Sequence, residues 1–155
     1  MKLLRALRAT AVPGVLASAA LVLAGCETMN SAWDSTVSFF GGSNVELSGA
    51  QEVPPVTTSA KGSGTIKVKD DHTVSGSIKT SGVVGTAAHI HMAAEGKNGP
   101  VIVPLTKGAD GDTWTVPDGA KLTDAQYGAY KASELYVNVH SAQNKGGEIR
   151  GQIKP

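Results

Sequence analysis

Short segments of strictly alternating apolar and polar residues begin at Val45 and continue to the end of the chain. Residues 64–69 place Ile66 and Val68 on one side, and residues 73–79 alternate again after a polar turn at residues 70–72. Because successive side chains of a strand point to opposite faces, this pattern predicts a β-hairpin over residues 64–79. The same pattern predicts further strands at residues 45–47, 86–92, 101–105, 113–116, 135–140 and 148–154.

One helix is predicted near residues 123–132. Thr123 and Gln126 have the spacing of a capping box, although Gly128 lowers the helix propensity of the segment. About eight strands with one helix and 19 glycines predict an all-β fold, an antiparallel Greek-key β-sandwich with one short helix. We expect Ile90, Val137, Val139 and Ile149 to form its core and Arg150 to point outward.

The first 25 residues follow a different pattern. Residues 1–8 carry three basic and no acidic side chains, and residues 9–24 form an apolar run too short and broken for a comfortable membrane span. The run ends in Leu23-Ala24-Gly25-Cys26, which resembles the bacterial lipobox. This order predicts a lipoprotein signal peptide over residues 1–25, export, and a lipid on Cys26 that anchors the protein in the bacterial cell envelope, on the periplasmic face or in the outer membrane. An ordinary signal peptide with an incidental cysteine is the alternative.

Residues 26–44 lack alternation and are rich in Ser, Thr, Asn and Gly, which is typical of a tether. They nevertheless contain Trp33, Phe39 and Phe40, three of the seven aromatic residues in the chain. Trp33, Val37 and Phe40 have helical spacing, so this segment either lies on the lipid interface or docks on the domain. The predicted organisation is a signal peptide at 1–25, a lipidated cysteine and tether at 26–44, and a domain at 45–155.

Charge and cysteine content exclude several classes of function. Removing the three basic residues of the first segment from the formal net charge of +1 leaves −2, and without a basic patch a nucleic-acid partner is not expected. A single cysteine allows no intramolecular disulfide. The sequence contains no nucleophile elbow, no phosphate-binding loop and no plausible acid/base carboxylate pair, so we expect no enzyme activity.

Three of the four histidines are candidates for a metal site. His89 and His91 share one strand face because a single residue separates them, and His140 lies on the polar face of residues 135–140. If the two strands are neighbours, the three imidazoles meet on one surface. Three neutral imidazoles suit copper or zinc, with a fourth position left to water, Met92 or a carboxylate.

The alternative for these histidines is a structural polar network that fixes the register of the strands. Its further members would be Glu52, Tyr136, Asn138 and Arg150. Arg150 is expected to form an ion pair with Glu52, although it also has the chemistry to receive an anionic ligand. The fourth histidine, His72, lies in the polar turn and is expected to be solvated.

Five motifs follow one another along the domain: Glu52-Val53-Pro54-Pro55, Ala88-His89-Ile90-His91, Gly99-Pro100-Val101, Leu135-Tyr136-Val137-Asn138-Val139-His140 and Gly147-Glu148-Ile149-Arg150-Gly151-Gln152. In content and order they resemble the motifs of the CHRD domain, which is named after chordin. The resemblance covers residues 45–155 and implies an extracytoplasmic β-rich domain, with Met92 standing where the family more often has glycine. The His-x-His strand also resembles Cu,Zn superoxide dismutase, but that enzyme needs more histidines and a disulfide, so no dismutase activity is expected.

Together with the lipobox, the CHRD resemblance predicts a lipid-anchored extracytoplasmic protein with a binding or structural role in the cell envelope. The alternative is a periplasmic lipoprotein that binds copper or zinc through His89, His91 and His140.

Overall fold

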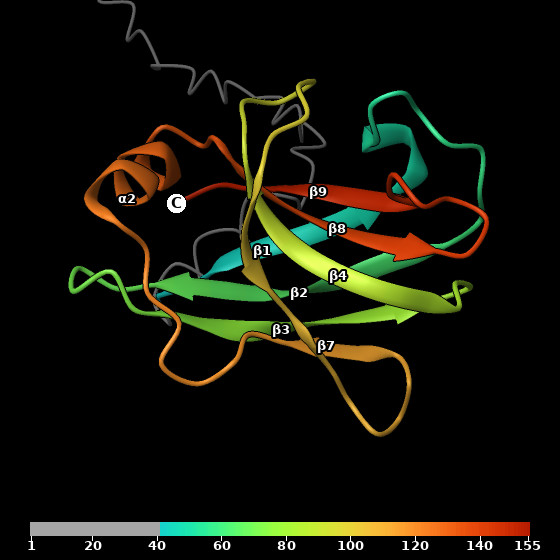
Figure 1. The fold of residues 1–155 in the computed structure, drawn as a ribbon, viewed down its shortest axis with the longest axis horizontal. Coiled ribbons are helices and arrows are strands. Elements are labelled where there is room, and N and C mark those ends of the chain that lie inside the picture. Colours follow the sequence, from blue (N-terminus) through green and yellow to red (C-terminus); the bar gives the residue numbers. More distant parts are fainter. Residues whose placement is uncertain (1–40) are drawn as a thin grey trace, which may run out of the picture.

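The computed structural model describes residues 41–155 (Figure 1). The predicted signal peptide, the lipidated Cys26, and Trp33, Phe39 and Phe40 of the tether lie outside the described residues. Within residues 41–155, no helix has both the length and the apolar character needed to cross a bilayer.

The described chain forms nine antiparallel strands, one short 3₁₀ helix and one α-helix. In chain order they are β1 (Ser43–Ser48), η2 (Gly49–Gln51), β2 (Lys61–Val68), β3 (Val74–Ser81), β4 (Gly85–Met92), β5 (Val101–Pro104), β6 (Thr106–Lys107), β7 (Thr113–Thr115), α2 (Asp124–Lys131), β8 (Leu135–Ser141) and β9 (Ile149–Ile153). The strands lie in one sheet in the order β5-β4-β8-β9-β1-β2-β3-β7-β6. The predicted all-β antiparallel fold with a single helix is confirmed.

The sheet curls until its two ends meet. β5 and β6 are the outermost strands of the sheet but are consecutive in the chain, separated only by Leu105. The Leu105 N–H donates to the carbonyl oxygen of Ala88 on β4, at 2.9 Å. The two layers of the fold therefore belong to one continuous, nearly closed sheet, in which β4, β8 and β9 face β2, β3 and β7 across the core (Figure 1).

The predicted helix is present and begins with a complete capping box. The Thr123 hydroxyl accepts from the Gln126 N–H, and the Gln126 side chain accepts from the Thr123 N–H. His72 is partly exposed, with 24% of its side chain accessible, so the expectation that it is solvated holds only in part. Its ring stacks on Tyr127 of α2 with 4.2 Å between centroids, and its Nδ1 lies 3.5 Å from the Asp124 carboxylate, so it helps to hold α2 against the β2–β3 turn.

The predicted core residues are buried: Ile90, Val137, Val139 and Ile149. The polar face of the same strands, however, is not open to solvent, and Arg150 is only 1% exposed. Two loops, residues 93–100 and 142–147, cover this outer face and hydrogen-bond to its side chains. The segment that follows η2 contacts the first loop, whose Asn98 amide donates to the Val53 carbonyl at 2.8 Å. The fold thus buries a polar layer outside the hydrophobic core, on β4, β8 and β9.

Candidate functional site

The pairing of β4 with β8 brings the three candidate histidines together. In this antiparallel register His89 lies opposite Asn138, His91 opposite Tyr136, and Ala87 opposite His140. The three histidine rings therefore share the outer face of the sheet, and one ring nitrogen from each lies within 4.8 Å of the others. His91 is buried, and His89 and His140 are half-buried.

Hydrogen bonds to backbone carbonyls decide which ring nitrogens carry protons. His91 Nδ1 lies 2.9 Å from the Gly99 oxygen, and His140 Nδ1 lies 2.9 Å from the Lys145 oxygen. Because a carbonyl only accepts, both Nδ1 atoms are assigned as N–H donors, which leaves both Nε2 atoms with a free lone pair in the neutral rings. The His140 Nε2 lies 3.0 Å from His89 Nδ1, whereas the buried His91 Nε2 has no partner.

This arrangement is the one that proteins use to orient metal-binding imidazoles, in which the second ring nitrogen donates to a carbonyl and fixes the tautomer. Burial lowers the pKa of His89, and the positive charge of protonated His140 would lower it further. Burial likewise lowers the pKa of His91, against the opposing effect of its bond to Gly99. Both rings are therefore neutral at neutral pH, which is the form that coordinates a metal.

The fourth position does not come from Met92. Strand alternation turns its side chain to the opposite face of β4, where it packs against the hydrophobic core. Among residues 41–155, no carboxylate or thiol joins the three histidines in a potential metal-ligand group. The described chain therefore offers three nitrogen donors, and a fourth ligand would be water or a small molecule.

Asn138 connects the histidines to a buried acid. It is 3% exposed, and its Nδ2 donates to the Gly146 oxygen at 3.3 Å. Glu52 is 4% exposed, and burial raises the pKa of its carboxyl to about 7, against the opposing effects of the Arg150 charge and of hydrogen bonds from Val53 and Asn138. The Glu52 Oε1 and the Asn138 Oδ1 are both buried without a partner.

The expected ion pair between Arg150 and Glu52 is not formed. No carboxylate of the described residues lies within 4.0 Å of the guanidinium, which contacts the Asn98 side chain at 3.4 Å. The guanidinium carbon instead lies 3.4 Å from the centre of the Tyr136 ring, a cation–π contact. Arg150 lies in the buried polar layer, where an aromatic ring and neutral oxygens surround its charge.

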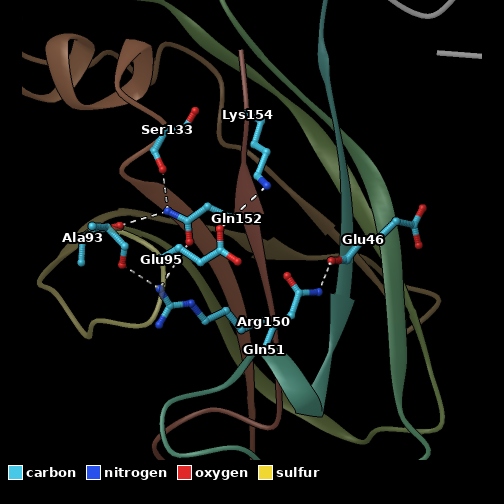
Figure 2. A network of polar contacts seen from close by, with 9 residues as sticks. Glu46, Gln51, Ala93, Glu95, Ser133, Arg150, Gln152 and Lys154 are labelled. Carbon is cyan, nitrogen blue, oxygen red and sulfur yellow. Dashed lines mark hydrogen bonds and ion pairs between the residues drawn. The ribbon is translucent and has the colours of Figure 1, made fainter. Parts of the chain in front are cut away.

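Arg150 and Gln152 attach the loop over residues 93–100 to β9 (Figure 2). The Arg150 guanidinium donates to the Ala94 oxygen at 3.5 Å and to the Gln152 Oε1 at 3.4 Å. The Gln152 amide donates to the Ala93 oxygen at 3.0 Å and to the Ser133 oxygen at 2.8 Å. The same loop supplies the Gly99 carbonyl that orients His91. By fixing this loop, Arg150 and Gln152 indirectly stabilise the position of the His91 ring.

Sequence reasoning placed Tyr136 in the polar network but missed its stacking on His91, and it missed the role of Gln152. The Tyr136 ring stacks on His91 with 4.8 Å between centroids and 9° between planes, and its hydroxyl accepts from the Gly99 N–H at 3.2 Å. Alternation with Asn138 and His140 was the signal that placed Tyr136 on the site face, and Gln152 shares a face with Arg150 in the same way. No periodic signal marks the carbonyls that orient the histidines, because they belong to loops.

Comparison with known proteins gives one match. A family model described as the CHRD domain matches residues 43–153, from the start of β1 to the end of β9. No match was found among curated proteins or among solved structures. The matched region contains all nine strands, the helix and every residue of the histidine cluster. The chain therefore belongs to the CHRD domain family.

Proposed function

We propose that this protein is an exported, lipid-anchored component of the cell envelope whose CHRD domain binds one copper or zinc ion through His89, His91 and His140. The family supports a binding or structural role, and the lipobox at Cys26 supports the anchor. The observation that carries the metal assignment is the convergence of three imidazole nitrogens within 4.8 Å on two paired strands. The proposed role is binding and not catalysis.

A buried, unpaired nitrogen favours a metal over a purely structural network. The His91 Nε2 is out of contact with solvent and has no hydrogen-bond partner. Leaving a buried acceptor unpaired costs about 1–3 kcal/mol, and coordination to a metal ion would remove that cost. A metal ion satisfies this lone pair without adding a buried donor, and the rigid strands supply the rest of the geometry.

The test uses the full chain, purified without an affinity tag, stripped with a chelator and titrated with Zn(II) and copper. We expect uptake of about one ion, with affinity falling as the pH drops through the histidine range because protonated imidazole does not coordinate. His89→Ala and His140→Ala should each abolish uptake. His72→Ala is the matched control, since its ring packs on α2, away from the cluster.

The opposite result would identify the structural network. In that case His89→Ala and His140→Ala would lower the free energy of unfolding by about 1–3 kcal/mol without changing the metal content. The metal assignment would also fail if the wild-type protein took up no ion at neutral pH, or if His72→Ala removed the ion as fully as His89→Ala.

A further inference from the structure

We propose that the three-histidine site selects a monovalent ion, Cu(I), over Zn(II) and Cu(II). This inference rests on the metal-binding function proposed above and names the ion for that same site. Two independent features of the described residues support it: the donor set contains no anion, and a permanent cation is buried in the same layer.

The donor set suits an ion that tolerates few and neutral ligands. His89, His91 and His140 supply three imidazole nitrogens, and no carboxylate or thiol of residues 41–155 joins them. With three histidines, Zn(II) would complete its tetrahedron, and Cu(II) its tetragonal set, with water or another ligand from outside the described residues. Cu(I), with a filled d shell and a single charge, is stable with three nitrogens in a trigonal arrangement. A half-buried divalent ion here would keep its full charge uncompensated by its ligands.

The buried cation is the guanidinium of Arg150. β8 lies between β4 and β9, so the Tyr136 ring lies between His91 and Arg150. The guanidinium carbon is 3.4 Å and the His91 ring centre 4.8 Å from the centre of the Tyr136 ring. The Arg150 charge and His91 thus contact the same aromatic ring. The repulsion between that charge and an ion bound at His91 is twice as large for a divalent ion as for a monovalent one.

Glu52 is the acid in this layer that opposes Arg150. Its carboxyl reaches the histidines only through the Asn138 side chain, and burial raises its pKa to about 7. At neutral pH the carboxyl is therefore only partly ionised, and it offsets only part of the Arg150 charge. The part of the Arg150 charge that Glu52 leaves uncompensated penalises divalent ions more than monovalent ones.

The experiment compares the affinities of the full-length wild-type protein for four ions at pH 7, using chelator competition in the absence of oxygen. Ag(I) serves as a monovalent probe that needs no reductant, beside Cu(I), Cu(II) and Zn(II). We expect Cu(I) to bind at least about tenfold more tightly than either divalent ion, a difference of more than about 1.4 kcal/mol. Equal or tighter binding of Zn(II) or Cu(II) would overturn the inference while leaving metal binding itself intact.

Two substitutions test the electrostatic cause with opposite signs. Arg150→Gln removes the cation and should raise the affinity for Zn(II) and Cu(II) more than the affinity for Ag(I). Glu52→Gln removes the opposing acid and should shift the preference further toward Ag(I). Should Arg150→Gln fail to fold, Glu52→Gln alone decides. Equal shifts for all ions would refute the role of charge, whereas absence of any ion from the wild-type protein would refute the function on which the inference rests.

Discussion

Glu52 is an acid buried in the same layer as a cation, yet the two do not pair. Its Oε1 has no hydrogen-bond partner, and burial dominates the pKa of the carboxyl and raises it to about 7. A buried carboxyl that keeps its proton avoids the large cost of placing an unpaired anion in a dry environment. The protonation of this one residue therefore affects the stability of the whole domain.

The consequence is a measurable dependence of stability on pH. Between about pH 4.5 and pH 7, folded Glu52 holds a proton that the unfolded chain has released, so raising the pH destabilises the fold by up to roughly 3 kcal/mol. Glu52→Gln stays neutral in both states. Relative to the wild-type protein, the variant should gain stability steadily across this interval in denaturant unfolding.

The histidines change the dependence of stability on pH in the direction opposite to Glu52, so the two contributions must be separated. Burial lowers the pKa of His89 and of His91, so their contribution to stability is lost as the pH falls below the ordinary histidine value. Both histidines are present in the wild-type protein and in Glu52→Gln, so their effect cancels in the difference between the two curves. A flat difference from pH 4.5 to pH 7 would show that Glu52 titrates normally.

At the scale of elements, the alternation of apolar and polar residues predicts the strands, whereas the loops determine which strand faces are buried. Periodicity located the hairpin over residues 64–79, the helix at Thr123 and both histidine strands, because each depends on local sequence. It did not predict that the polar face of β8 and β9 is buried. That cover comes from residues 93–100 and 142–147, whose contacts with the sheet are long-range and leave no period in the sequence.

The histidine cluster shows the same limit. Alternation along each strand shows which of its side chains share a face. The pairing of β4 with β8 depends instead on the strand order of the whole sheet. The Gly99 and Lys145 carbonyls that fix the histidine tautomers are invisible in the sequence, since every residue has a carbonyl. The sequence thus supports the set of donors but not their protonation or their burial.

The loop between β8 and β9 offers a matched pair of substitutions. Gly147 has φ of +134°, and a Cβ there would collide with the Glu52 carboxylate and the Asn138 amide. Gly147→Ala should therefore lower the free energy of unfolding by at least about 1 kcal/mol. Gly146, its neighbour, has open space around its Cα, so Gly146→Ala should change stability by no more than about 0.5 kcal/mol. Equal effects in chemical denaturation would refute the close packing of this loop on the polar layer.

At the scale of the whole molecule, the described domain accounts for residues 41–155, and the proposed anchor depends on the sequence before it. Leu23-Ala24-Gly25-Cys26 follows a basic and then an apolar segment, so the mature protein is expected to begin at Cys26 and to partition with membranes. Cys26→Ser should block lipidation and release the protein from the membrane fraction. Retention of that variant in membranes after cleavage at the same bond would show that the lipid is not the anchor.

The closure of the sheet through Leu105 bears on how these molecules behave when crowded together. An open sheet presents a row of unpaired backbone groups that recruits strands of other copies and seeds aggregation. Here the two outermost strands are short and joined through a single residue, and the Lys107 ammonium of β6 donates to the Gly85 carbonyl of β4 at 2.7 Å across the seam. A charged side chain thus occupies the place where a foreign strand would begin to pair, which protects the domain from edge-to-edge association at high local concentration.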